Sequence, residues 1–265
     1  MECIACHSEE IIRYGYYKTF RKYKCKNCHR QFSERSFSFF TRYRFPEEII
    51  KAAILLFMFV STRNVKFLIA ETYGFYFSHV TAYNWSRKFA SLLSSKVRKQ
   101  DFSSIWHVDE KFIKVKSIKQ GYEWVVIDDR NSIIATYVSD SRDIKSAIIA
   151  LELAVQRAIK PPDILVSDGC PAYIKSARKV FGRKVKHIKA HFKAEGFMHK
   201  GRLHYLSNNR IEGLNSKINL WYKKFRGFKS LETANLWCNM WMYFYNFMRP
   251  RIVRNEVISI NQILV

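Results

Sequence analysis

The stretch SIWHVDEKFIKVKS at residues 104–117 is followed by GYEWVVIDDR at 121–130 and SIIATYVSD at 132–140. All three are rich in β-branched and aromatic residues and are separated by turn residues, which predicts an antiparallel meander. Residues 142–159 then have helical apolar spacing, and PPDILVSDG at 161–169 is typical of a short buried strand. The sequence therefore predicts an α/β domain with a mixed sheet and helices on its faces.

The elements that follow extend this alternation of helix and strand. We expect a helix over 171–181, a strand over 184–188 and a long helix from about residue 207. Residues 230–248 are aromatic-rich with helical spacing. This last segment is expected to pack on the core or on a second subunit.

Three helical segments are predicted upstream of the sheet. Residues 46–60 open with a proline and two glutamates, which suit the first turn of a helix, and then become apolar. A second helix over 63–75 ends near Gly74, and Ser78 caps a third. A helix, a short glycine-containing turn and a helix are typical of helix-turn-helix DNA-binding domains. The alternative is a three-helix bundle that only separates two domains.

Four cysteines near the N-terminus have the spacing of a metal site. Cys3, Cys6, Cys25 and Cys28 form two CxxC pairs separated by eighteen residues. Each CxxC turn places two thiolates on one side of a loop, so two turns complete a tetrahedral zinc site. The intervening residues favour short strands, and we expect a zinc ribbon with structural Zn²⁺. His7 and His29 lie beside the cysteines but exceed the four ligands that zinc requires.

The charge of the chain predicts a polyanionic partner. The 265 residues carry a formal charge of +24, far more than solubility requires. Residues 175–229 hold sixteen Lys or Arg and only two acids, with aromatic residues interleaved. This pattern favours DNA over an acidic membrane surface, because basic side chains bind phosphates and aromatic side chains stack on bases. The alternative is a basic face that is merely solvated.

Two further features bear on location. The chain opens with no cationic stretch followed by a short apolar segment, and the longest apolar run, residues 52–60, is too short to cross a bilayer. We therefore expect a cytoplasmic, nucleoid-associated protein whose cysteines are reduced or bound to metal.

Three carboxylates are candidates for catalysis. Asp109 lies among apolar residues of the first strand, where a lone carboxylate is costly unless it has a partner or a metal. Asp168 ends the buried strand before Gly169, where open α/β sheets place their sites, and Glu212 lies early on a helix. Three such ligands can bind two Mg²⁺ ions for an in-line phosphoryl transfer. Taken singly, each also has a structural explanation, as a lysine partner, a turn or helix cap, and a helix-dipole residue.

The segments WHVDEKFIKVK (106–116), LVSDGCPAY (165–173) and LSNNRIEGLNSKI (206–218), followed by RGFKSLETA, carry a family resemblance. They resemble the DDE-type transposases of prokaryotic insertion sequences, in particular the insertion-sequence-six-like group. The resemblance implies an RNase H-like catalytic fold and a metal-binding triad of Asp109, Asp168 and Glu212, with Mg²⁺ or Mn²⁺. It also implies cleavage and strand transfer at terminal inverted repeats, with water or a DNA 3′-hydroxyl as nucleophile.

Two departures from the family pattern concern the residues around Glu212. Many members carry Lys or Arg seven residues after the glutamate, where this chain has Asn219. The interval between Asp168 and Glu212 is also longer than usual, and it contains Glu195, the alternative third carboxylate. His187 and His191 are spaced like a metal pair on a helix, but DNA contact or packing is favoured because no cysteine pair lies nearby.

The predicted organisation is a zinc ribbon over 1–36, a helix-turn-helix domain over 37–100, a catalytic domain over 101–228 and a helical segment over 229–265. The expected partner is double-stranded DNA, at element ends and target, bound by a homodimer or larger assembly. The alternatives are a non-catalytic zinc-ribbon and helix-turn-helix regulator, and a metal-dependent nuclease without strand transfer. Predicted DNA contacts come from seven residues: Asn84, Arg87, Lys88, Arg210, Lys217, Lys223 and Lys224.

Overall fold

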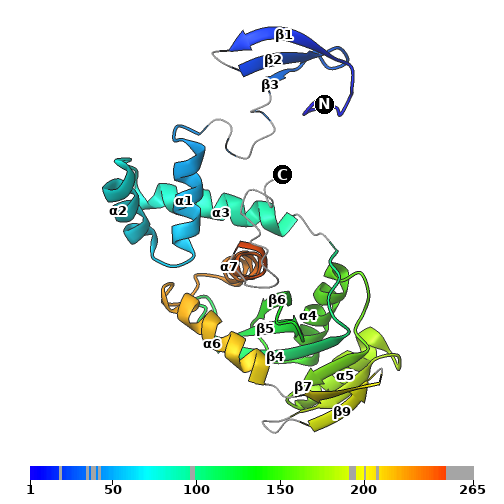
Figure 1. The fold of residues 1–265 in the computed structure, drawn as a ribbon. Helices are drawn as coiled ribbons and strands as arrows, with labels where there is room; N and C mark the ends of the chain where they lie inside the picture. The colour runs from blue at the N-terminus through cyan, green and yellow to red at the C-terminus, as the bar shows by residue number, and fades with distance from the viewer. Residues whose placement is uncertain are drawn as a thin grey trace.

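The computed structural model describes residues 1–17, 20–33, 36, 40, 43–95, 99–190, 195–199, 201–206 and 209–248. The N-terminal part is a three-stranded antiparallel sheet of β1 (Ile11–Tyr17), β2 (Phe20–Cys25) and β3 (Gln31–Ser33). Its small core consists of Cys3, Cys25 and Phe32. This sheet stands apart from the rest of the molecule (Figure 1).

Three helices follow, close to where the sequence predicts them: α1 (Glu47–Phe57), α2 (Thr62–Tyr73) and α3 (His79–Ser95). The Ser61 side chain accepts a hydrogen bond from the Asn64 amide at the start of α2, and Gly74 ends it with a φ of 68°. Ser78 caps α3 by accepting a hydrogen bond of 3.1 Å from the Thr81 amide. Side-chain capping and a left-handed glycine therefore set the boundaries of these helices.

The central sheet has five strands in the order β6-β5-β4-β7-β8. The meander predicted from the sequence is β4 (Ile105–Ile113), β5 (Gly121–Asp128) and β6 (Ile133–Ser139), and it is antiparallel. The strands β7 (Ile164–Ser167) and β8 (Lys186–Lys189) extend it in parallel to β4. The mixed sheet confirms the predicted α/β fold class.

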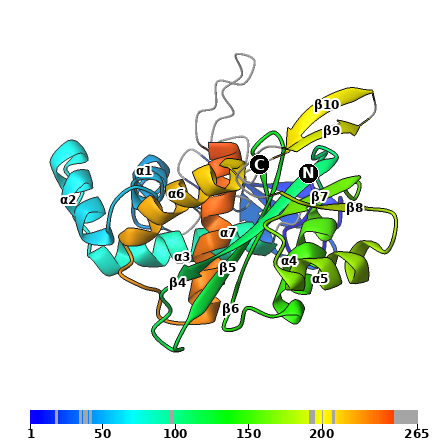
Figure 2. The same cartoon turned by 90° about the horizontal axis from the view of Figure 1, so that it is seen from below.

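Helices cover both faces of this sheet (Figure 2). The helices α4 (Ile144–Arg157) and α5 (Pro171–Phe181) cover one face, where Trp106, Val108 and Trp124 are buried. The other face is covered by α6 (Asn209–Lys223) and α7 (Leu231–Tyr243), which continues into a π-helical turn, η2 (Phe244–Met248). Alternate residues of β4 therefore point to different helices.

The helix α7 packs on the core, which was the first of the two alternatives for the segment after residue 230. Its Trp237 is buried, with the ring centroid 4.9 Å from that of Phe57 in α1 and 5.6 Å from that of Tyr83 in α3. One continuous apolar cluster therefore joins α1, α2 and α3 to the sheet. The helices of the predicted helix-turn-helix domain (37–100) therefore contact the sheet through a shared apolar core.

The long interval before α6 contains a hairpin that the sequence did not predict, β9 (Glu195–His199) paired with β10 (Arg202–Leu206). Glu195 begins this hairpin, whereas His191 lies outside the described residues, as does everything after residue 248. Within the described part of the chain, no helix combines the length and apolar character needed to span a membrane.

Candidate active site and zinc centre

Asp109 lies at the centre of β4, on the face of the sheet that α6 covers. Because side chains alternate along a strand, Lys111 shares this face whereas Glu110 points to the opposite one. The Asp109 side chain is partly buried beside α6. The strand thus presents one carboxylate to each face of the sheet at adjacent positions.

Asp168 follows the last residue of β7, the strand parallel to β4. The pairs Trp106 with Leu165 and His107 with Val166 set the register of the two strands. Continuing that register by two residues brings Asp168 level with Asp109. An Asp168 oxygen accepts a hydrogen bond of 2.9 Å from the Cys170 amide, just before α5 begins.

Glu212 lies in the first turn of α6 and is exposed. One turn later, the Asn215 Nδ2 donates a hydrogen bond of 2.9 Å to Asp109 Oδ2. This contact joins two residues that are 106 positions apart in the chain. It fixes the helix that carries Glu212 against the strand that carries Asp109.

The pKa of Asp109 is raised to about 7, first by burial and then by the negative charges of Glu110, Asp168 and Glu212. Asp168 and Glu212 are therefore close enough to Asp109 to disfavour its charged form, and a bound cation would relieve that repulsion. Their oxygens are the hard donors that Mg²⁺ and Mn²⁺ prefer. The donor set fits a divalent metal, consistent with the metal predicted from the sequence.

Glu110 has a structural role that the sequence did not indicate. On the face opposite Asp109, its almost fully buried carboxylate accepts hydrogen bonds from the Arg142 guanidinium and from the Tyr173 hydroxyl. Tyr173 belongs to α5, the helix that starts just after Asp168. The network therefore ties the strand of Asp109 to the segment of Asp168, and the position of Glu110 next to Asp109 in an alternating strand is the signal that could have found it.

A lysine from the sheet lies beside Asn219 of α6. Lys111 Nζ donates a hydrogen bond of 3.1 Å to the Asn219 side-chain oxygen. It also forms an ion pair of 3.2 Å with Glu123, which is buried on β5. The cation near Asn219 is therefore supplied by β4, two residues after Asp109, and the sequence alone did not identify it.

The predicted DNA-contacting residues lie in two groups. Asn84, Arg87 and Lys88 are exposed on α3, with the Lys88 ammonium 5.0 Å from the centre of the Tyr43 ring. The other group lies on or just after α6, where Arg210, Lys217 and Lys223 are exposed.

Lys224 is placed differently from the other six. Its ammonium lies 4.2 Å from the centre of the Phe57 ring and donates a hydrogen bond to the Phe57 carbonyl. Burial lowers the pKa of Lys224 to about 7. The structure therefore directs Lys224 toward α1 and away from the solvent-facing side of α6.

His187, for which DNA contact or packing was favoured, lies on β8 and contacts β7. Its Nε2 is 2.9 Å from the Ser167 hydroxyl, next to Asp168 in the sequence. Burial, followed by the charge of Lys189, lowers the pKa of His187. His187 therefore packs within the sheet, and it is not on a helix as a metal pair with His191 requires.

The four N-terminal cysteines come together in the ribbon. Their sulfurs all lie within 4.8 Å of one another, with 3.4 Å between Cys3 and Cys28 and 3.6 Å between Cys6 and Cys25. Four sulfurs around a tetrahedral zinc, each about 2.3 Å from the metal, lie roughly 3.8 Å apart. The arrangement therefore fits one zinc ion.

Backbone hydrogen bonds in the ribbon favour the thiolate of Cys3, the form that binds a metal. Burial acts to raise the pKa of the Cys3 thiol, but backbone hydrogen bonds from Cys6 and Ala5 lower it to about 6. His7 and His29, each following a CxxC pair, adopt left-handed φ values of 58° and 56°. They shape the two turns, and the ligand cluster consists of the cysteines.

Comparisons with known proteins cover mainly the sheet and the helices around it. A family profile described as a DDE domain matches residues 103–249. The chain is also 44% identical, over 34 residues, to an uncharacterized protein in transposable element ISH50 of Halobacterium salinarum. These 34 residues are 13% of this chain and 12% of that protein. This chain therefore spans a small part of the length of the curated relative that it matches.

Three solved structures align at low identity. The simian T-cell lymphotropic virus intasome in complex with PP2A regulatory subunit B56 gamma is 13% identical over 61% of this chain and 55% of that one (TM-score 0.40). The HTLV-2 integrase catalytic core domain in complex with magnesium is 16% identical over 58% and 93% (TM-score 0.42). The BIV integrase catalytic core domain is 14% identical over 57% and 88% (TM-score 0.37). Because the DDE profile covers more than half of the 265 residues, this protein belongs to the DDE-domain family of insertion-sequence transposases.

Proposed function

We propose that this protein is a transposase that cleaves DNA at the terminal inverted repeats of an insertion sequence and joins the cut ends to target DNA. The observation that supports the proposal is that the negative charges of Asp168 and Glu212 act on Asp109, whose pKa is raised first by burial and then by its acidic neighbours. Carboxylates in this arrangement suit phosphoryl transfer, with water or a DNA 3′-hydroxyl as the attacking group.

Asp109, Asp168 and Glu212 would hold the divalent metal, Mg²⁺ or Mn²⁺. When bound, the metal supplies activation of the attacking oxygen and stabilisation of the leaving oxygen. Asn215 keeps Asp109 oriented toward α6 through its hydrogen bond. Because the pKa of Asp109 is about 7, protons compete with metal at this carboxylate in acidic solution, and activity should fall as pH drops below neutrality.

The remaining residues would bind and position DNA. Lys111, beside Asn219, would place a positive charge near the phosphates of the element end. Asn84, Arg87 and Lys88 on α3 would contact a major groove, while Arg210, Lys217 and Lys223 would contact the backbone. Cys3, Cys6, Cys25 and Cys28 would hold the structural zinc of a ribbon that helps to find the ends.

The assembly is proposed to be a homodimer or larger, because the two ends of an element must be brought together for transposition. The chain would act in the cytoplasm on nucleoid DNA. Both the assembly and the location are inferred from the proposed reaction.

The test is a cleavage and strand-transfer assay with purified full-length protein, Mg²⁺ or Mn²⁺, and labelled DNA from the flanks of its own gene. The Asp168→Asn variant should lose roughly a thousandfold or more in rate, equivalent to about 4 kcal/mol of transition-state stabilisation. Asp140→Asn, which changes an exposed carboxylate of the same domain, is the matched control and should retain activity.

Two outcomes would replace the proposal. Tight binding to the flanks without cleavage under either metal would favour the DNA-binding regulator. Cleavage without joining of a supplied DNA 3′-hydroxyl end to target would favour the nuclease.

A further inference from the structure

The segment RGFKS at 226–230, just after α6, forms a turn that lies against the end of β4. Arg226 and Gly227 have φ values of 52° and 99°. A side chain at Gly227 would meet the Lys114 carbonyl oxygen at 3.2 Å. Phe228 then pairs with this extension of β4, donating to the Lys114 carbonyl and accepting from the Lys116 amide at 2.9 and 2.8 Å. The turn thus holds Phe228 and the following Lys229 at a fixed place beside β4.

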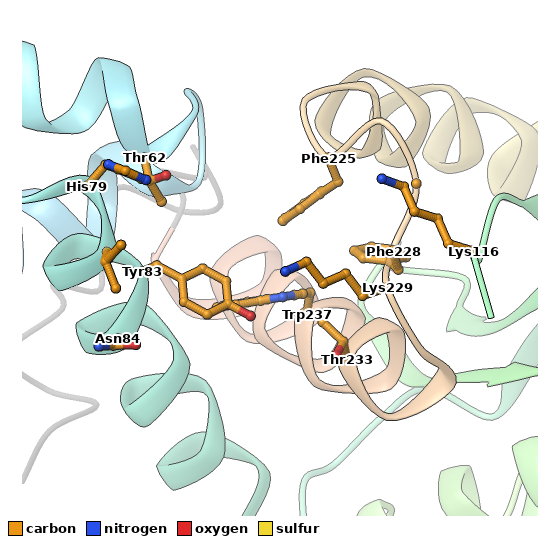
Figure 3. A pocket seen from close by; sticks show the side chains of 12 residues that line it. Thr62, His79, Tyr83, Asn84, Lys116, Phe225, Phe228, Lys229, Thr233 and Trp237 are labelled. Carbon is orange, nitrogen blue, oxygen red and sulfur yellow. The ribbon is translucent and has the colours of Figure 1, made fainter.

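A pocket of about 470 Å³ lies between this turn and the helix α3. Figure 3 shows Tyr83 of α3 on one side of it, Phe225 and Phe228 on the other, and Trp237 of α7 behind. The volume is within the range of sites that bind small organic groups, about 300–1,000 Å³. The lining residue Lys116 lies beyond the C-terminal end of β4, seven residues after Asp109, or ~23 Å along an extended chain.

The walls of the pocket are aromatic, with the rings braced against one another. The Tyr83 and Trp237 ring centroids are 5.6 Å apart. Phe225 is stacked on Trp237 with an angle of 27° between the ring planes. Because Trp237 is buried and contacts both neighbours, Tyr83 and Phe225 are held in place, and the parts of these rings that line the pocket are open to another flat ring.

The rim of the pocket is positive. Lys116 and Lys229 line it and are exposed, and none of the described lining residues is acidic. Within the described part of the chain, neither lysine has an ion-pair partner. The Lys229 side chain runs toward the space between Tyr83 and Phe225 (Figure 3). The flat apolar walls suit a nucleobase, and the ammonium groups of Lys116 and Lys229 at the rim suit its phosphate.

We propose that this pocket binds one unpaired nucleotide of DNA, with its base against Tyr83 and Phe225 and its phosphate between Lys116 and Lys229. A base within a duplex has both faces covered, so only a base outside the stack reaches these rings. Asn84, on the pocket wall, and Arg87 one turn later on α3 are exposed, so a duplex on this helix brings its backbone to the pocket. The inference rests on the proposed function for its ligand, because a transposase creates and holds unpaired DNA ends.

The test uses duplexes from the flanks of the gene, each with one 5-iodo-deoxyuridine that is either unpaired or paired at the same position. The labelled position is moved one nucleotide at a time across the end of the element. Light then cross-links the label to the full-length protein. We expect the unpaired label to cross-link to peptides containing Tyr83, Phe225 or Trp237 about tenfold more than the paired label. Tyr83→Phe should keep this preference, and Tyr83→Leu should lose it.

The affinities separate the charge effect from folding. Lys229→Gln, an exposed position, should weaken binding of the unpaired duplex about tenfold and that of the paired duplex much less. Lys145→Gln, an exposed lysine on α4, is the matched control and should change neither. If the cross-links map elsewhere, or if paired and unpaired labels cross-link equally, the nucleotide-binding proposal is wrong. If the protein still cleaves DNA in that case, the proposed transposase function stands. Absence of both DNA binding and cleavage would overturn both.

Discussion

In the N-terminal ribbon, four thiols from two turns lie within 4.8 Å of one another, and no other group of three or more candidate ligands among the described residues is gathered as closely. The candidate carboxylates, by contrast, come from β4, the end of β7 and α6, and the pKa of Asp109 is raised by burial and then by the charges of Glu110, Asp168 and Glu212. The first site is assembled by local turns. The second is assembled by the packing of distant elements.

This difference follows from the ligands. Thiols give up their remaining protons as the metal binds, and the metal offsets the charge of the thiolates, so a compact set can form within a short segment. Carboxylates are charged at neutral pH, and three of them can be gathered only by a scaffold that bears the repulsion. The sheet does this through contacts around Asp109, including Asn215 and the network of Glu110.

The largest expected effect concerns the local site. Cys25→Ser should abolish stoichiometric zinc and unfold the ribbon, because structural zinc contributes about 10–16 kcal/mol of apparent folding free energy in small zinc domains. Zinc content and amide protection in β1 and β2 measure this. Cys170→Ser, which changes a thiol outside the ribbon, should keep the zinc, and equal loss in both variants would refute the four-cysteine site.

A smaller effect is expected at the contact between β4 and α6. Lys111→Asn should destabilise the protein by about 3 kcal/mol, because buried Glu123 loses its partner. It should also reduce cleavage about tenfold if Lys111 contacts DNA. The exchange Lys111→Asn with Asn219→Lys returns a cation to the same place. Recovery of cleavage in the double variant is the decisive measurement, and recovery of stability alone would leave Lys111 only a structural role.

The burial of Asp109, together with its acidic neighbours, should be visible as a dependence of stability on pH. This carboxyl ionises near 3.8 in the unfolded chain and near 7 in the folded protein, so the folded state binds more protons between these values. Stability from this group is therefore complete below pH 4 and is lost as pH rises to about 7. Asp109→Asn should raise the free energy of unfolding by about 1–3 kcal/mol at pH 8 without divalent metal, with little change at pH 4.

The same two proteins, compared with and without Mg²⁺, test whether Asp109 binds the metal. Added Mg²⁺ should raise the melting temperature of the wild type at pH 8, because it binds only the folded arrangement, and should raise that of Asp109→Asn much less. Equal stabilisation of both proteins would mean that Asp109 is not a ligand.

The last expected effect comes from Lys224, where packing has overridden a sequence pattern. Its pKa is about 7 in the folded protein and 10.5 in the unfolded chain, so the unfolded state binds more protons between these values. Stability should rise with pH in that window, at up to about 1.4 kcal/mol per pH unit. Lys224→Met should lack this slope while binding DNA as the wild type does. A tenfold loss of DNA affinity in this variant would instead mean that Lys224 contacts DNA.

Much of the molecule followed from short-range patterns. The CxxC pairs predicted a cysteine cluster, and apolar periodicity with capping residues located α1, α2, α3 and the meander to within a few residues. The hairpin β9–β10 was missed because its short strands, in a basic segment, lack clear alternation between apolar and polar residues. Lys224 was assigned to DNA by its charge alone, because a basic sequence pattern does not distinguish a lysine facing solvent from one lying across the Phe57 ring.

The sequence by itself determined which residues have the chemistry: four thiols at zinc spacing, and acids at a strand centre, a strand end and a helix start. Spacing along the chain is enough where the ligands are close in sequence. Only the tertiary structure decided that Asn215 holds Asp109, that Lys111 lies beside Asn219, and that α3 and the turn after α6 enclose an aromatic pocket. These contacts join residues about 100 positions or more apart, and their existence depends on how strands and helices pack, which no local pattern encodes.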